Sequence, residues 1–213
     1  PIPTVNAVNN QTVCAGAMTT AITFTGAVAG SSYSWINSNT AIGLGAGGTG
    51  NIAAFTAVNG GTTPITGTIT VTPTYTNGGA TCSGTPINFT ITVNPSPTVS
   101  AVTNQTLCAG SSTAAINFSG NLASTVYNWT NSNTSIGLPA SGTGNIASFT
   151  AINGGTTVVV ATITVTPVFT NAGVTCPGIP RNFTITVNPI PTVNAVNNQT
   201  VCAGAMTTAI TFT

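Results

Sequence analysis

Five cysteines are the residues in this sequence whose type and spacing point to a defined covalent chemistry. Cys14 and Cys82 are 68 positions apart, Cys108 and Cys176 have the same separation, and Cys202 is the fifth. Thiols placed this way form disulfides in an oxidising compartment. Serine and threonine hydroxyls are abundant, but the chain has no His, Asp, Glu or Lys that could act as a general base toward them. The sequence therefore predicts no enzymatic activity.

The near absence of charge excludes several further classes of function. Arg181 is the only basic residue and there is no acidic one, so the net charge is +1. Nucleic-acid binding requires a basic surface, and calcium or magnesium sites require carboxylates. Zinc sites require clustered Cys or His, and no apolar run reaches the roughly 18 residues of a membrane helix. We expect no cofactor, no metal, no nucleic-acid partner and no membrane insertion in this segment.

The sequence repeats itself with a period of 94 residues. PIPTVNAVNNQTVCAG opens the chain, PSPTVSAVTNQTLCAG begins 94 positions later, and the first string returns after another 94. Residues 1–25 and 189–213 are identical at all 25 positions, so a cassette of 188 residues is itself repeated. A unit of 94 residues has the size of an independent domain, and we expect the chain to be part of a longer array. The predicted units are repeat 1 at 1–94, repeat 2 at 95–188, and the start of a third repeat at 189–213.

Within a unit, apolar residues alternate with Thr and Asn, which is typical of half-buried strands. The clearest alternation runs through residues 65–75 and 87–93, and shorter segments surround Ile22, Tyr33 and Ile52. Residues 4–14 form a broken first strand, and Gly, Asn and Ser separate the segments. About seven short strands in roughly 100 residues predict an all-β fold of tandem immunoglobulin-like, antiparallel Greek-key β-sandwiches.

Each complete repeat contains two cysteines, which makes pairing within the repeat the economical choice. We predict the disulfides Cys14–Cys82 and Cys108–Cys176, with Cys202 unpaired within the chain. Free buried thiols and bridges between repeats are the alternatives. A disulfide closing so long a loop contributes about 4 kcal/mol on the chain-entropy account. It would also divert tension around the 68 residues that it encloses.

The junctions between repeats read Asn-Pro-x-Pro, at residues 94–97 and 188–191. Proline restricts the backbone, and no Gly/Ser tether separates the units. The array should therefore behave as a stiff rod.

Three other features have both a functional and a structural interpretation. Residues 43–48 match GxGxxG, but no helix follows them, so a Gly-rich connection is predicted. Trp35 and Trp129 could line a sugar site, but a core position between the sheets is the simpler interpretation. Thr-x-Thr rows resemble ice-binding arrays, yet they also suit the solvent face of strands. Candidate glycosylation sites of the Asn-x-Ser/Thr type are Asn10, Asn88, Asn104, Asn117, Asn128, Asn133, Asn182 and Asn198.

A series of motifs resembles a known family of repeats. It comprises VCAG, YSWINSNTAIGL with YNWTNSNTSIGL, GTGNIAAFTAVN with GTGNIASFTAIN, and TCSGTPINFTITVNP. These resemble the PKD-like, immunoglobulin-like tandem repeats of very large cell-surface adhesins and filament proteins of Bacteroidota. The resemblance implies export to the cell surface and a role in stalks, filaments or adhesion.

We therefore expect a non-catalytic structural segment of an extracellular fibre or adhesin stalk. Its expected partners are further copies of the repeat in series, with lateral self-association into a filament as an additional contact. The alternative is an adhesive module that binds carbohydrate or another surface, with ice as a less favoured ligand. Exposed tryptophan rings would favour that alternative.

Overall fold

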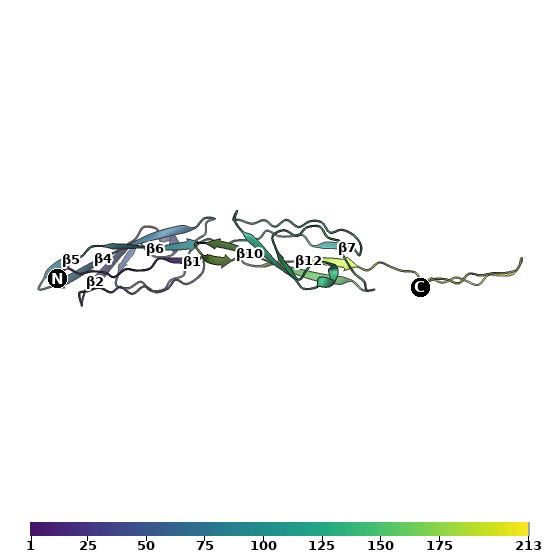
Figure 1. Ribbon diagram of the computed structural model, residues 1–213, viewed down its shortest axis with the longest axis horizontal. Helices are drawn as coiled ribbons and strands as arrows, with labels where there is room; N and C mark the ends of the chain where they lie inside the picture. The colour runs from purple at the N-terminus through teal and green to yellow at the C-terminus, as the bar shows by residue number, and fades with distance from the viewer. Residues whose placement is uncertain (213) are drawn as a thin grey trace.

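The computed structural model describes residues 1–212, so the last residue of the predicted third repeat, Thr213, lies outside the described residues. The predicted all-β class is confirmed: β-strands dominate, and the described helices are two single 3-10 turns. The two complete repeats lie end to end, and the N-terminus and the C-terminal segment lie at opposite ends of an elongated molecule (Figure 1). Residues 189–212 contain no strand and are exposed throughout beyond Pro189.

Each repeat contains six strands and one 3-10 turn. In repeat 1 these are β1 (Gln11–Cys14), β2 (Ser32–Asn37), η1 (Thr40–Ile42), β3 (Gly47–Thr49), β4 (Ile65–Asn77), β5 (Ala80–Ser83) and β6 (Ile87–Asn94). In repeat 2 they are β7 (Gln105–Cys108), β8 (Val126–Asn131), η2 (Thr134–Ile136), β9 (Ser141–Thr143), β10 (Val159–Asn171), β11 (Val174–Pro177) and β12 (Arg181–Asn188).

The six strands of a repeat form one mixed sheet. Its order in repeat 1 is β1-β6-β4-β2-β3, with β5 paired to the far part of β4, and repeat 2 has the equivalent order. The prediction of a purely antiparallel sheet is wrong at one position, because β1 pairs with β6 in parallel, as β7 does with β12. The break in the first strand explains this pairing. Residue 6 still bonds to the opposite layer, where the Asn6 amide donates to the Thr25 carbonyl, before the chain crosses to β6.

The second layer of each sandwich is extended chain that is joined by isolated bridges. Ile22 and Ile52 exchange two backbone hydrogen bonds of 2.8 and 3.0 Å, and Met18 bridges Thr56. The segments expected to be strands around Ile22 and Ile52 are therefore bridged segments, which accounts for six strands where about seven were expected. The irregular spacing of apolar residues after Ile52 prevents a continuous ladder there.

Each repeat has its own apolar core between the two layers. In repeat 1, Ile69, Val71 and Ile91 are completely buried, and Phe24 and Ile42 pack against them from the other layer. The alternation read from β4 holds in the structure: its apolar residues face the core, and its threonines lie on the outer face. On that face the Thr66 and Thr92 hydroxyls are 2.9 Å apart across the β4–β6 pair. Such cross-strand pairs add modest stability without any charge.

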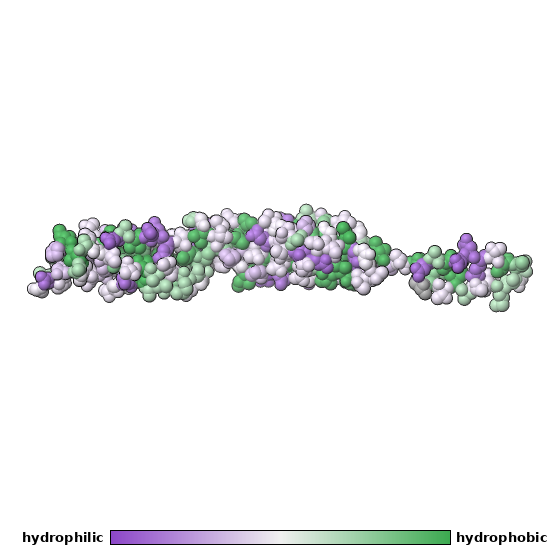
Figure 2. Space-filling model, turned by 60° about the horizontal axis from the view of Figure 1, so that its bottom comes forward, coloured by the Kyte–Doolittle hydropathy of each residue, from purple (hydrophilic) through white to green (hydrophobic). Residues whose placement is uncertain are grey.

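The surface is correspondingly neutral. Figure 2 shows apolar and polar residues interspersed along the length of the molecule, most of them with intermediate hydropathy. With so little charge to screen, contacts between the repeats must rely on hydrogen bonds, packing and covalent bonds.

Candidate functional site

The feature that joins the two repeats is a disulfide between Cys14 and Cys176. The two Cα atoms are 5.5 Å apart, and the bond spans 162 positions of sequence. The predicted pairs Cys14–Cys82 and Cys108–Cys176 are therefore wrong, and the alternative of a bridge between repeats is the observed one. Cys82, Cys108 and Cys202 are exposed free thiols.

The sheet register explains why the cysteines of one repeat do not pair. Cys14 lies beside Asn94 at the end of β6, whereas Cys82 lies beside Tyr75 on β4. Val93, next to the end of β6, pairs with Ile65 on β4. The position on β4 beside Cys14 is therefore ten residues away from Tyr75, the position beside Cys82. At about 3.3 Å per residue this distance is roughly 33 Å. A disulfide requires Cα atoms within about 7 Å, so the two thiols lie at opposite ends of the repeat.

The β10–β11 hairpin reaches across the junction. Its tip extends from repeat 2 toward the end of repeat 1 at which β1 and β6 finish (Figure 1). The Asn171 side-chain amide donates to Asn94 Oδ1 at 2.8 Å, and Asn94 Nδ2 donates to the Asn171 carbonyl at 3.3 Å. Asn94 is completely buried. A buried amide is stable only when it is hydrogen-bonded, and the neighbouring repeat supplies its partner here.

The turn of that hairpin has a tight geometry. Ala172 and Gly173 both adopt positive φ angles, of 49° and 75°, as the corresponding Gly78 and Gly79 do in repeat 1. Two consecutive positive φ angles are typical of the two-residue hairpin turn that matches strand twist. The turn thereby places Asn171 and Cys176 at the end of the repeat 2 sheet, where Asn171 hydrogen-bonds to Asn94 and Cys176 is bonded to Cys14.

Equivalent positions in the two repeats show what the junction covers. Cys176 is 1% exposed in β11, whereas Cys82 at the same position of β5 is exposed. Asn94 is completely buried, whereas its counterpart Asn188 is only half-buried. Within each pair the residue type is the same, so the difference in burial comes from the docking of one repeat on the other.

The two tryptophans lie on the inner side of β2 and β8. Trp129 is 7% exposed within the core of repeat 2, and Trp35 is half-buried against the core of repeat 1. Each indole lies over a glycine of the adjacent strand, Gly48 or Gly142, where a Cβ would collide with the ring. Both indole N–H groups are buried without a hydrogen-bond partner. The rings are thus not presented for stacking on a sugar.

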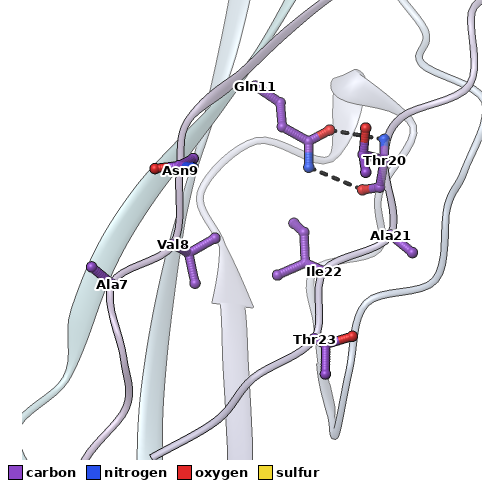
Figure 3. Close-up of a pocket in the computed structure, with 8 residues that line it drawn as sticks. All are labelled: Ala7, Val8, Asn9, Gln11, Thr20, Ala21, Ile22 and Thr23. Atoms are coloured by element: carbon purple, nitrogen blue, oxygen red, sulfur yellow. Dashed lines mark hydrogen bonds between the residues drawn. The ribbon is translucent and has the colours of Figure 1, made fainter.

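A groove lies between the broken first strand and the segment that follows it. It has a volume of about 340 Å³, and Gln11 closes one end by bonding to both backbone groups of Thr20 at 2.9 Å. Figure 3 shows Val8 and Ile22 pointing toward one another in this space. Gln105 and Gln199 make the same pair of bonds in their repeats. The groove contains no charged or aromatic side chain, so it serves to hold the chain crossing together.

The remaining predicted features lie in ordinary structural positions. Of residues 43–48, the first four connect η1 to β3 and the last two lie in β3, and Gly43 ends η1 with a φ of 95°. Arg181 is exposed at the start of β12.

The candidate glycosylation residues are exposed, except that Asn133 is half-buried and caps η2 by accepting a hydrogen bond from the Ser135 backbone amide. Asn10 and Asn104 accept hydrogen bonds of 2.8 Å from the backbones of Thr90 and Thr184.

Residues 1–212 contain neither a cluster of metal-ligating side chains nor a membrane-spanning helix. No three His, Cys, Asp or Glu side chains in that range come together as metal ligands. Nor does that range contain a helix of the length and hydropathy needed to cross a membrane.

Sequence reasoning missed Asn94, Asn171 and the Cys14–Cys176 bond. The available signal was the position of each cysteine in its strand. Cys14 ends a strand that runs along the repeat, and Cys82 lies in a hairpin preceded by the long alternating segment 65–75. Those two facts together place the thiols at opposite ends.

Comparison with known proteins gives a family match over part of the chain. Residues 11–97 match the PKD-like domain family. No curated protein matches the chain.

Solved structures with some similarity include domains 1–6 of the surface layer protein SbsC, at 16% identity over 76% of this chain and a TM-score of 0.28. Human protocadherin-24 EC1-2 is 11% identical over 89% of this chain and 99% of that chain, with a TM-score of 0.36. The human desmocollin-1 ectodomain is 10% identical over 90% of this chain and 42% of that chain, with a TM-score of 0.32. The chain spans 20% of the surface layer structure.

Proposed function

We propose that this chain is a non-catalytic, load-bearing segment of an extracellular fibre or adhesin stalk, in which neighbouring repeats are clamped together covalently. The observation that carries the proposal is the Cys14–Cys176 disulfide between repeats. It adds a covalent bond to the connection between the two repeats. The match of residues 11–97 to the PKD-like domain family is consistent with this role.

The non-covalent contacts support a stiff connection as well. The hydrogen bonds between Asn94 and Asn171 lie on the same face of the junction as the disulfide. The linker prolines Pro95 and Pro97 are buried and Ser96 is exposed. A buried, proline-restricted linker together with a covalent clamp leaves few ways for one repeat to bend against the next.

The direction of the strands suits tension along the axis. The N-terminus lies at the outer end of repeat 1, and β1 lies near the end that faces repeat 2 (Figure 1). Since β1 ends at Cys14, the chain up to that residue spans the length of the repeat. While the disulfide is intact, it transmits the load from β1 directly to β11 of repeat 2. The β1 segment lies parallel to β6, so after reduction tension along the axis pulls these two strands past each other and loads their hydrogen bonds together.

Contacts in series are better supported than lateral ones. The edge strands of the sheet in repeat 1 are short, since β1 and β5 have four residues each and β3 has three. Short edges are one way in which β-proteins avoid edge-to-edge pairing. The neutral surface would also make the fibre insensitive to ionic strength. An oxidising, extracellular location follows from a structural disulfide.

Counting free thiols in the purified, unreduced chain tests the clamp. Denatured without reductant, the chain should show three reactive thiols, those of Cys82, Cys108 and Cys202. Pairing within repeats would leave one, that of Cys202. The string TVCAG surrounds both Cys14 and Cys202, so mass spectrometry is done on the Cys202→Ser variant, in which it occurs once. Proteolytic fragments of that variant should contain TVCAG linked to a TCPG peptide. Recovery of TVCAG linked to TCSG would overturn the proposal.

A further inference from the structure

The outer ends of repeats 1 and 2 carry the counterparts of the residues that form the junction between them. At the outer end of repeat 1, the β4–β5 hairpin presents Asn77 and Cys82, the counterparts of Asn171 and Cys176. At the outer end of repeat 2, β7 and β12 finish with Cys108 and Asn188, the counterparts of Cys14 and Asn94. Cys82, Cys108 and Asn77 are exposed, and Asn188 is half-buried.

We infer that each of these ends binds a further repeat of the same cassette through the same junction, so that Cys108 bonds to the hairpin cysteine of the repeat that follows and Cys82 to the first-strand cysteine of the repeat that precedes. The inference rests on the proposed function and names its partner. The internal junction, where equivalent residues meet and form the bond, supplies the geometry.

The hairpin of repeat 1 fits such a socket sterically. Between the asparagine and the cysteine, which are kept, Gly78 replaces Ala172 and Ala80 replaces Val174. Both of these replacements are smaller, so this part of the hairpin introduces no collision in a junction of the same shape. Outside it, Ser83 replaces Pro177, and Tyr75, opposite Cys82, replaces Phe169, opposite Cys176. The glycine also adopts a positive φ more readily than alanine does.

The direction of the chain agrees with this arrangement. Residues 189–212 leave repeat 2 at the end where β7 lies and continue along the axis (Figure 1), and β7 finishes with Cys108 beside Asn188. The sequence of residues 189–212 is that of the start of repeat 1, so a third repeat that continues as repeat 1 does would have the TCSG hairpin. The expected bond at that junction is therefore between TLCAG and TCSG.

Repeated at every junction, this pairing produces two covalent lines along the fibre. One line enters repeat 2 through the Cys14–Cys176 bond, follows β12 and leaves along the linker that leads to Cys202 in the next repeat. The other enters repeat 2 along the linker, follows β7 and leaves through Cys108. The strands β7 and β12 are hydrogen-bonded neighbours in the sheet. The two lines thus lie side by side in every repeat, and a single backbone break leaves one of them intact.

Bond formation is an ordinary oxidation. The two thiols lose two protons and two electrons to a low-molecular-weight disulfide such as oxidised glutathione, which is reduced to two thiols. Exchange proceeds through a mixed disulfide with the attacking thiolate.

The test uses a longer chain in which residues 1–213 are followed directly by a second copy of residues 26–188. This chain contains four complete repeats in the register that the identity of 1–25 with 189–213 prescribes. After equilibration in a glutathione redox buffer, fragments should contain TLCAG linked to TCSG as well as TVCAG linked to TCPG. Two thiols should remain free, one at each end.

The four cysteine-containing strings differ from one another and each occurs twice in this chain, so each outcome identifies one type of pairing. TVCAG–TCPG links without TLCAG–TCSG links, with four free thiols, would overturn the inference and leave the proposed clamp standing. Links of TVCAG to TCSG would overturn both. In the first cassette, Cys108→Ser should remove only the TLCAG–TCSG link and leave three free thiols, which controls for adventitious oxidation.

Discussion

The side-chain amides of Asn94 and Asn171 meet across the junction of two repeats, 77 positions apart in sequence, with Nδ2 of Asn171 2.8 Å from Oδ1 of Asn94. Asn94 is completely buried although its own repeat satisfies neither of its side-chain polar atoms. The two repeats therefore contact each other through specific side-chain hydrogen bonds, and the nearby disulfide adds a covalent bond between them.

Replacing Asn94 should weaken the junction specifically. Asn94→Ala removes both hydrogen bonds and leaves the Asn171 amide unpaired, at an expected cost of about 1–3 kcal/mol. We would measure thermal unfolding in a Cys14→Ser/Cys176→Ser background, where the disulfide does not mask the loss. Asn188→Ala is the matched control, because Asn188 makes no side-chain hydrogen bond within residues 1–212, and it should change stability by less than about 0.5 kcal/mol. Equal effects of the two substitutions would contradict the assigned contact.

A cut between Cys82 and Cys108 should leave the two fragments of the chain joined by the disulfide. Such a cut lies outside the loops that the predicted Cys14–Cys82 and Cys108–Cys176 bonds would close. A protease recognition sequence inserted between Thr85 and Pro86, both exposed, lies between Cys82 and Cys108. After cleavage, the Cys14–Cys176 bond should hold the fragments together on a denaturing gel without reductant, and reductant should release two bands. The Cys176→Ser variant should give two bands under both conditions. Two bands from the unsubstituted chain without reductant would mean that the clamp is absent.

Pulling the chain from residues 1 and 213 should reveal a short covalent path. With the disulfide intact, only the 13 steps before Cys14 and the 37 steps after Cys176 can extend. At about 3.5 Å per residue the fully extended length is roughly 180 Å, against roughly 740 Å after reduction. Pairing within repeats would leave 76 steps and give roughly 270 Å. Single-molecule force spectroscopy distinguishes the three lengths.

The contact between Trp129 and Gly142 should not tolerate a side chain. In Gly142→Ala the new Cβ collides with the indole ring, which must move within a packed core. We expect destabilisation of about 1–3 kcal/mol, measured by denaturant unfolding. Gly154→Ala provides the control, since a Cβ there meets nothing within 4 Å. Comparable losses in both variants would mean that the indole does not lie where the structure places it.

Stability should be almost independent of pH from about pH 4 to 8. The chain has no Asp, Glu, His or Lys whose pKa could differ between the folded and unfolded states. At high pH one group does matter: burial raises the pKa of Tyr127 above its ordinary value, and a hydrogen bond with the Thr125 side chain opposes this shift.

The folded state therefore holds the Tyr127 proton more tightly than the unfolded state does. Its contribution to stability is complete below the ordinary tyrosine pKa of about 10 and is lost as the pH rises through the raised value. Tyr127→Phe should reduce the fall in unfolding free energy above pH 10. A marked transition near pH 4–5 would contradict the account, because no side chain could produce it.

The strands and the core were predictable because they depend on local patterns. Alternation in residues 65–75 and 87–93 gives β4 and β6 their buried and exposed faces, and the same rule identifies β2 through Tyr33 and Trp35. The segments around Ile22 and Ile52 could not be resolved in this way, because whether an extended segment becomes a ladder or a few bridges depends on its neighbours.

By itself, the sequence determined the period of 94 residues, the all-β class and the nearly uncharged surface. It also provided the five thiols from which disulfides can form. Only the tertiary structure decided which thiols meet. Pairing depends on distance in space, and the parallel β1–β6 register places Cys14 at one end of its repeat while the β4–β5 hairpin carries Cys82 to the other. Equal sequence spacing within each repeat could not reveal that the nearest partner of Cys14 belongs to the next one.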